Sequence, residues 1–171
     1  NRRTRGIEEV NLGWRIDALT FDFPIVAAPM DSVMSPATAI AFGRLGGLGV
    51  LNLEGLWTKY SDPTALLDEL AGIEDPVAAT RRMQELYAVP IQPELITARM
   101  AELRAAGVAV AGSLSPQTCA EFAPVIEKAG LDFFVIRGTT VSAEHVSTVT
   151  EPLNLKKFIY ELDVPVIVGG C

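Results

Sequence analysis

Short apolar segments alternate along the chain with longer amphipathic ones, and this alternation constrains the fold more than any other feature. Five apolar runs stand out, at residues 23–28, 48–53, 108–114, 131–136 and 164–168. Runs that are apolar on both faces suit strands buried in a parallel sheet better than half-exposed antiparallel strands. The amphipathic segments between the runs predict helices, so the order of elements indicates an α/β fold.

The predicted helices have clear start and stop signals. A residue that can cap a helix precedes proline, which suits the first helical position, in four pairs: Ser35–Pro36, Asp62–Pro63, Asp75–Pro76 and Ser115–Pro116. Glycine marks the helix ends, at Gly46, Gly107 and Gly130. Residues 54–107, between the second and third runs, leave room for about three helices. We interpret this interval as an elaboration on one face of the fold or an oligomer contact.

Five βα units fit either a doubly wound open sheet or part of a (β/α)8 barrel. A dinucleotide-binding sheet should carry G-x-G-x-x-G after its first strand, whereas Pro29, Met30 and Asp31 follow the first run here. The glycines of residues 45–49 precede a strand, so we interpret them as a helix stop. We therefore expect a (β/α)8 TIM barrel, of which the chain covers roughly strands 1–5. A five-stranded flavodoxin-like domain is the alternative.

The charge balance is acidic, with 14 Lys and Arg against 21 Asp and Glu. This balance argues against a nucleic-acid surface but allows a phosphorylated small molecule, because backbone amides also bind phosphate. Two cysteines and one histidine exclude a disulfide framework and a Cys/His zinc cluster. No apolar run approaches the length of a membrane span, and no signal peptide is evident. We expect a cytoplasmic protein with no nucleic-acid and no membrane partner.

Two segments carry a specific resemblance to a known family. AAPMDSVMSP (residues 27–36) and AIAFGRLGGLGVLNLE (residues 39–54) resemble the first βαβ unit of the IMP dehydrogenase/GMP reductase family. The resemblance implies a (β/α)8 barrel that acts on a purine nucleoside monophosphate (IMP, GMP or XMP) with NAD or NADP. In that family a cysteine thiolate attacks purine C2, and a hydride moves between C2 and the nicotinamide. The resemblance also implies a homo-oligomer and allows a monovalent cation in the whole protein.

The resemblance further narrows the domain organisation. Classical IMP dehydrogenases insert a pair of CBS domains after the second strand, and residues 54–107 are too short for that pair. We therefore expect residues 1–171 to form a single partial barrel domain without CBS domains. The missing insert, the Asn-Leu-Glu-Gly sequence after the second run and Arg137 after the fourth resemble the bacterial IMP-dehydrogenase-related branch.

The same resemblance places substrate-binding residues at Ala28, Met30 and Cys171. The turn after the first strand lies against the base and ribose in the family, and a thioether suits the flat face of a purine. The alternative makes Met30 a core plug and Asp31 an N-cap, although Asp31 and Ser32 fit turn residues whose side chains bond to backbone amides. Cys171 stands where the family has an asparagine. The family's nucleophilic cysteine follows strand six, so the catalytic residue is unknown here.

The expected cofactor contacts follow the fourth and fifth strands, at Arg137, Gly138, Thr139 and Gly169. Arg137 stands where the family usually has an aspartate that contacts the dinucleotide. Its guanidinium could meet a phosphate, or it could pair with one of two nearby carboxylates, Glu144 or Glu151.

For two other titratable residues we expect structural rather than functional roles. We interpret His145 as a surface residue and Cys119 as a small core residue. Two functional alternatives to the dehydrogenase stay open. One is the GMP reductase direction, and the other is a catalytically inactive nucleotide-binding barrel, which the Arg137 and Cys171 departures motivate.

Overall fold

The computed structural model describes residues 6–138 and 153–169. The predictions made for Thr139, His145 and Cys171 therefore lie outside the described residues, as do both carboxylates proposed above as partners of Arg137.

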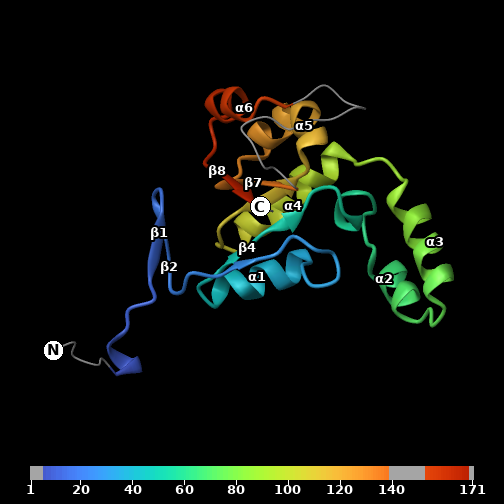
Figure 1. The fold of residues 1–171 in the computed structure, drawn as a ribbon, viewed down its shortest axis with the longest axis horizontal. Helices are drawn as coiled ribbons and strands as arrows, with labels where there is room; N and C mark the ends of the chain where they lie inside the picture. The colour runs from blue at the N-terminus through green and yellow to red at the C-terminus, as the bar shows by residue number, and fades with distance from the viewer. Residues whose placement is uncertain (1–5, 139–152, 170–171) are drawn as a thin grey trace.

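Parallel strands form the centre of the molecule (Figure 1). β3 (Val26–Ala27) pairs with β4 (Leu48–Gly49), and four further strands form a second sheet in sequence order. These are β5 (Leu51–Asn52), β6 (Ala111–Leu114), β7 (Phe133–Arg137) and β8 (Val166–Gly169), all parallel. Only Val50 separates β4 from β5. The predicted α/β fold with a parallel sheet is confirmed, although each strand is shorter than the apolar run that predicted it.

Helices connect the strands along the chain. They are α1 (Pro36–Arg44), α2 (Thr64–Ala71), α3 (Pro76–Tyr87), α4 (Pro93–Ala105), α5 (Pro116–Ala129) and α6 (Leu155–Glu161), with short 3-10 turns η1 (Ile7–Glu9) and η2 (Leu56–Thr58). The side chains of Ser35 and Asp75 cap α1 and α3 as expected. The Asp62 carboxylate accepts from the Thr64 amide, as an N-cap side chain does, although α2 begins at Thr64, one residue after the predicted start. Ser115 precedes α5, but its side chain does not cap the helix.

An antiparallel hairpin precedes the parallel strands, and the sequence analysis did not predict it. β1 (Trp14–Ile16) pairs with β2 (Leu19–Phe21), and Asp17 adopts a positive φ of 50° at the turn. The Phe21 ring packs against Trp14 and Phe133, with centroid distances of 5.1 and 6.0 Å. Three-residue strands are too short for apolar alternation to reveal them, which explains the omission.

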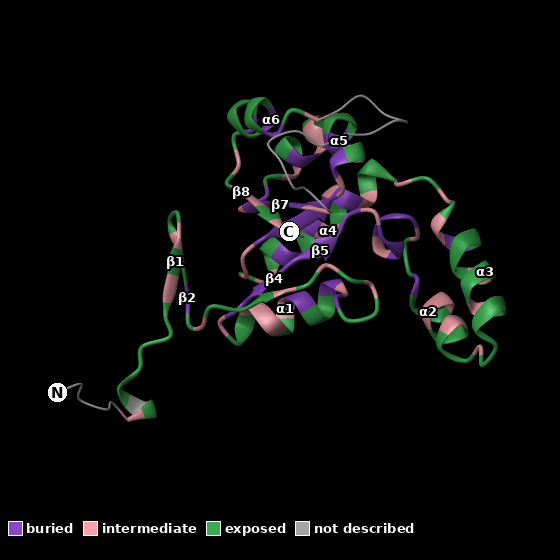
Figure 2. Ribbon diagram, in the orientation of Figure 1, coloured by how far each residue is buried: buried purple, intermediate pink, exposed green. Residues whose placement is uncertain are grey.

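The sheet buries a different cluster on each face. One cluster joins the strands to the helices, and the other joins them to the hairpin. Figure 2 shows the buried residues on the central strands. Strand register places Asn52, Ser113, Val135 and Ile167 in one row. Because Val135 and Ile167 pack in the hairpin cluster, the row lies on the face away from the helices. Side chains two residues apart share a face, so Arg137 lies there too.

α2 and α3 form a pair that projects from the body of the molecule (Figures 1 and 2). We call this pair, residues 64–87, the arm. It contributes little to the core, since α2 has no buried residue and α3 has only Leu86. The Arg82 guanidinium pairs with Glu69 at 2.7 Å and holds the two helices together.

Candidate functional site

Polar side chains gather at the carboxyl ends of the parallel strands. Asn52 ends β5 and Glu54 follows it, Ser115 follows β6, and Arg137 ends β7. The carboxyl ends of parallel strands lie on one edge of a sheet, which is where α/β proteins place their ligand sites. Among these four residues, the sequence analysis predicted a ligand contact for Arg137 alone.

Glu54 is the centre of this group, and four hydrogen bonds converge on its carboxylate. Ser115 donates twice, from its backbone amide at 2.8 Å and from its hydroxyl at 2.8 Å. The Thr118 hydroxyl donates at 2.9 Å, and Arg137 Nη2 donates at 3.1 Å. A carboxylate offers about four lone-pair positions, so these donors saturate it. Ser115 therefore does not cap α5, because its hydroxyl bonds to Glu54 instead.

Arg137 reaches across a neighbouring strand. Its Nη2 also donates to Asn52 Oδ1 at 2.8 Å, and β6, which carries Ser113 on the same face, lies between the two strands. Arg137 Nε and Ser113 Oγ are both buried and have no hydrogen-bond partner among the described residues, yet the Arg137 side chain is 40% exposed. The guanidinium is thus bonded to protein through Nη2, while part of the side chain reaches solvent. Within the described residues its carboxylate partner is Glu54.

The loop after β3 presents Met30 to solvent. The Met30 amide donates to the Ala28 carbonyl, and the Met30 carbonyl accepts from the amides of Val33 and Met34. Met30 is 50% exposed, whereas Met34 is buried, so the core-plug interpretation of Met30 is wrong. The N-cap interpretation of Asp31 is also wrong, because Ser35 caps α1.

Asp31 instead joins three segments. Its Oδ2 accepts from the Leu56 amide at 2.7 Å and from the Tyr87 hydroxyl at 2.5 Å. The expected bond to a backbone amide is present, but that amide lies 25 residues along the chain. Burial, reinforced by the bond to Asp31, raises the pKa of Tyr87 above its ordinary value, which keeps the hydroxyl protonated as a donor.

The segment after β5 is itself firmly held. Lys59 is buried, and its Nζ donates to the Val89 carbonyl at 2.6 Å. Burial lowers the pKa of Lys59, while the carboxylates of Glu54 and Asp31 oppose that shift. Both carboxylates therefore lie within electrostatic reach of one ammonium group, which links the Met30 loop to the Glu54 segment.

The two glycines predicted to bind the cofactor lie beside Arg137, one in the sequence and one in the strand register. Gly138 follows it with a φ of 143°, and a Cβ there would lie 3.3 Å from the Pro116 ring, so glycine lets β7 end close to the start of α5. Gly169 is opposite Arg137 in the register of β7 and β8, and a Cβ added there would meet nothing within 4 Å. A side chain at position 138 would therefore crowd the start of α5, whereas the space beside Gly169 is open.

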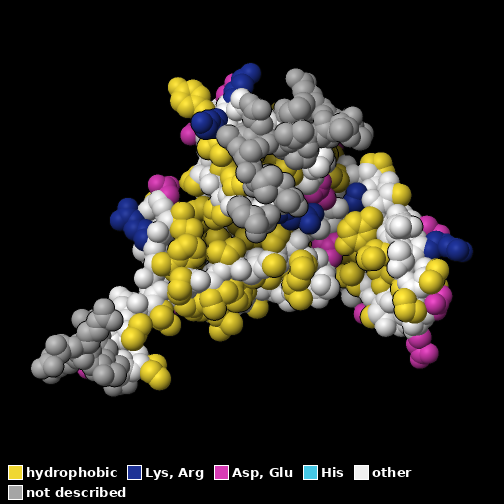
Figure 3. Space-filling model, in the orientation of Figure 1, with side chains coloured by type: hydrophobic (Ala, Val, Ile, Leu, Met, Phe, Trp, Pro, Cys, Tyr) yellow, Lys and Arg dark blue, Asp and Glu magenta, His cyan; other side chains and the backbone are white. Residues whose placement is uncertain are grey.

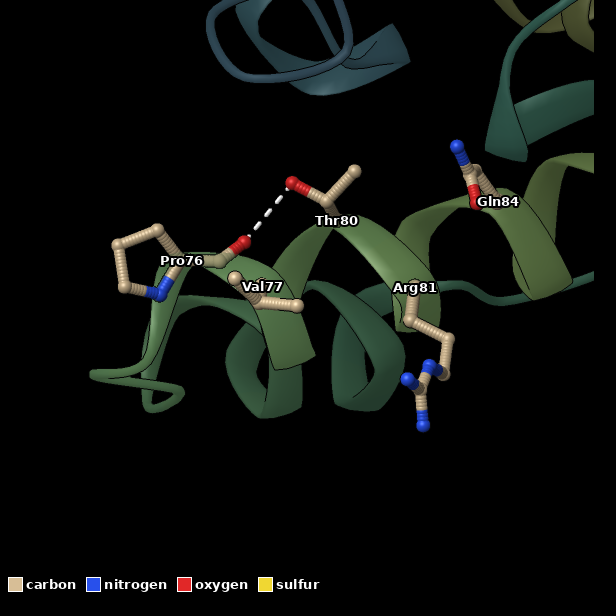
Figure 4. Close-up of a pocket in the computed structure, with 5 residues that line it drawn as sticks. All are labelled: Pro76, Val77, Thr80, Arg81 and Gln84. Atoms are coloured by element: carbon tan, nitrogen blue, oxygen red, sulfur yellow. Dashed lines mark hydrogen bonds between the residues drawn. The ribbon is translucent and has the colours of Figure 1, made fainter.

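Two hollows lie on the arm. One, of about 520 Å³, separates the arm from the Met30 loop, and its lining includes Asp31, Leu67, Met83 and Tyr87. The other, of about 390 Å³, lies along α3 alone, where the Thr80 hydroxyl donates to the Pro76 carbonyl (Figure 4).

The remaining sequence predictions concern the core, metals and membranes. Cys119 is fully buried, as expected, and burial with Glu54 nearby raises its pKa to about 12. Among residues 6–138 and 153–169, no three His, Cys, Asp or Glu side chains are grouped to hold a metal ion. In the same stretches, no helix is both long and apolar enough to cross a membrane.

Hydrophobic side chains gather over the middle of the face shown in Figure 3. Exposed hydrophobic residues include Val26 on β3 and Val168 on β8. In the described residues β3 and β8 each pair on one side only, and the strands do not close into a ring.

Comparison with known proteins gives a consistent picture. No family model matches the chain. The chain is 49% identical to an uncharacterized oxidoreductase of Mycobacterium bovis and 48% identical to one of Mycolicibacterium smegmatis, over 99% of its own length and 46% of theirs. It thus spans about half the length of the curated relatives it matches.

A solved structure is similar over the same extent. It is an IMP dehydrogenase/GMP reductase-like protein from Corynebacterium glutamicum, 47% identical, with a TM-score of 0.86 over 99% of this chain and 45% of that one. The fold prediction is confirmed: the chain has the α/β fold of a (β/α)8 barrel, of which it covers about the first five strands.

Proposed function

We propose that the chain belongs to an NAD(P)-dependent purine nucleotide oxidoreductase of the IMP dehydrogenase/GMP reductase family, in its IMP-dehydrogenase-related branch. Similarity over 99% of the chain to proteins named oxidoreductases and to one named IMP dehydrogenase/GMP reductase-like supports the class. The observation that carries the proposal is the half-exposed Met30 in a bonded loop at the same strand edge as the partly exposed Arg137.

The residues present fit a nucleotide and a dinucleotide. Met30 offers a polarisable surface for a purine ring, and the amides of the loop offer donors. The Arg137 side chain is 40% exposed, and its guanidinium suits a phosphate oxygen. Ala28, Gly138 and Gly169 would border these groups, and Thr139 and Cys171 are proposed to complete the two sites. When bound, the nicotinamide dinucleotide supplies the hydride acceptor or donor.

A catalytically inactive nucleotide-binding barrel is the second candidate, and one observation favours it. Within residues 6–138 and 153–169, the carboxylate that pairs with Arg137 is that of Glu54, and four donors from this chain already occupy it. It has no free position to accept a hydrogen bond from a ribose hydroxyl. A dinucleotide would then be held by phosphate contacts to Arg137 rather than through its ribose.

The experiment that separates these functions uses the whole protein. It is incubated with IMP and NAD or NADP, and separately with GMP and NADPH, while the absorbance of the reduced cofactor is followed. A rise with IMP identifies the dehydrogenase, and a fall with GMP identifies the reductase. Nucleotide binding by calorimetry without either change identifies the inactive barrel. No binding of IMP, GMP or XMP contradicts the proposal.

A further inference from the structure

Asp31 connects the Met30 loop to two other parts of the molecule. It follows Met30 directly, and its Oδ2 accepts one hydrogen bond from the Leu56 amide and one from the Tyr87 hydroxyl. Leu56 lies two residues after Glu54, which holds Arg137, and Tyr87 is the last residue of α3 in the arm. One carboxylate oxygen therefore joins both halves of the candidate site to the arm.

The packing around Asp31 is tight on the side of Glu54. A Cβ added at Gly55 would lie only 2.1 Å from Asp31 Oδ1, so the residue next to Glu54 has to be glycine for the two loops to approach this closely. Oδ1 is buried and has no hydrogen-bond partner within residues 6–138 and 153–169, which is unfavourable for a carboxylate. A small displacement of Asp31 would thus be transmitted to residues 54–56 rather than absorbed.

The arm packs weakly against the body of the molecule. Its helices bury almost nothing, and few buried apolar contacts mean a low local free energy of opening. The 520 Å³ hollow lies between its inner face and the Met30 loop, and the Tyr87–Asp31 bond bridges the rim of that hollow. A second bond holds the same end of the arm, from the Tyr60 hydroxyl to the Leu86 carbonyl at 3.2 Å, and it does not involve the site.

We propose that Asp31 is a positioning residue, which holds the Met30 loop in place relative to the Glu54–Arg137 pair. Tyr87 links the position of the arm to the position of this loop. The inference rests on the proposed function, in which Met30 faces the purine nucleotide and Arg137 faces the dinucleotide. Asp31 itself touches neither. An arm displaced from the body would release Met30 and lower the affinity for the purine nucleoside monophosphate.

The two tyrosines give a matched comparison in the whole protein. Tyr87→Phe removes the hydroxyl bonded to Asp31, and Tyr60→Phe removes one bonded to the same end of the arm but not to the site. Asp31→Asn, which keeps one oxygen acceptor, is the milder second variant. Two measurements are made on each: amide hydrogen exchange over residues 30–34, and the dissociation constants of IMP, GMP and XMP by calorimetry.

We expect Tyr87→Phe to speed exchange at residues 30–34 and to weaken nucleotide binding roughly three- to tenfold, the loss for one hydrogen bond. If the protein turns over, KM should rise with a smaller change in kcat. Tyr60→Phe should alter neither measurement, and Asp31→Asn should lie between wild type and Tyr87→Phe.

Two results would overturn the inference: Tyr87→Phe that behaves like wild type in both measurements, or Tyr60→Phe that matches Tyr87→Phe. A wild-type protein that binds none of the three nucleotides would sink the proposed function instead. In that event the exchange comparison between the two tyrosine variants still decides whether Asp31 holds the loop.

Discussion

Arg137 Nη2 lies 3.1 Å from Glu54 Oε2, and this ion pair joins the ends of β7 and β5 across the intervening strand β6. The pair is asymmetric, because four donors fill the acceptor positions of Glu54 whereas the Arg137 side chain is 40% exposed. Glu54 therefore fixes the place of a positive charge that is free to meet a ligand.

The Glu54→Gln variant tests this role. Glutamine keeps the shape but loses the charge and one acceptor oxygen, so we expect the free energy of unfolding to fall by about 1–3 kcal/mol. Dinucleotide affinity should fall as well, because Arg137 loses its anchor. Urea denaturation and calorimetry measure the two effects. Glu121→Gln, at an exposed position on α5, is the control that should change neither.

Substitution of Arg137 tests the phosphate contact itself. We expect Arg137→Met to weaken dinucleotide binding roughly 10- to 100-fold, the loss for hydrogen bonds to a charged group. Arg137→Lys keeps the charge without the planar fork and should lie between. Arg81→Met removes an equal charge from the outer face of α3 (Figure 4) and serves as control. Equal affinity of all three variants would remove Arg137 from the cofactor site.

Arg137→Asp, which would restore the residue usual in the related family, is a poor rescue experiment here. The new carboxylate would face Glu54, and Glu54 would lose its only charged donor among the described residues. Like charges this close oppose one another, so a loss of activity would be uninformative.

Substitution of Gly55 tests the contact between the Met30 loop and the segment that carries Glu54. Its φ of −86° suits any residue, so Gly55→Ala is opposed only by Asp31. We expect a loss of about 1–3 kcal/mol in the free energy of unfolding from overpacking. Adding Asp31→Ala should recover part of the loss, giving a non-additive double-mutant cycle. Gly72→Ala, with its nearest contacts at 3.5 Å, should be neutral.

The raised pKa of Tyr87 predicts a specific pH dependence. The folded state holds this proton more tightly than the unfolded state, whose pKa is near 10.0. The contribution of Tyr87 to stability is therefore complete below about pH 10 and falls as the pH rises above it. The free energy difference between wild type and Tyr87→Phe should therefore narrow as the pH rises above about pH 10. Tyr160→Phe, at a 92% exposed position, should show no such change.

The thiol of Cys119 should be inert in the folded protein. Its pKa of about 12 leaves it protonated near neutral pH, and it is fully buried. Only the thiolate reacts readily. Alkylation followed by peptide mass mapping should label Cys119 only after unfolding in urea. Rapid labelling of the native protein would contradict the burial described here.

The sequence predicted the parts of the molecule that local patterns determine. Apolar runs located the parallel strands, Ser35 and Asp75 marked helix starts, and Gly130 ends α5 with a φ of 66°. In each case the residues that decide the outcome lie within a few positions of one another, so their spacing carries the signal.

The site depended on contacts that no local pattern reveals. Glu54 meets Ser115 at a separation of 61 residues, and Tyr87 meets Asp31 at 56. Ser115 has the sequence of an N-cap, yet its hydroxyl bonds to Glu54 because the strand ends bring the carboxylate within reach. The sequence offered one signal for the site, which is the pair of polar residues Asn52 and Glu54 at the end of an apolar run. Such a pair is typical of a strand end that carries functional side chains.

The central claim is that the edge formed by Met30, Glu54 and Arg137 binds a purine nucleotide and a nicotinamide dinucleotide. Amide hydrogen exchange of the whole protein, with and without GMP or IMP and the dinucleotide, tests it most directly. We predict slower exchange with the ligands at residues 28–34, 52–56 and 113–116. Unchanged exchange there, or protection confined to other parts of the molecule, would contradict the account.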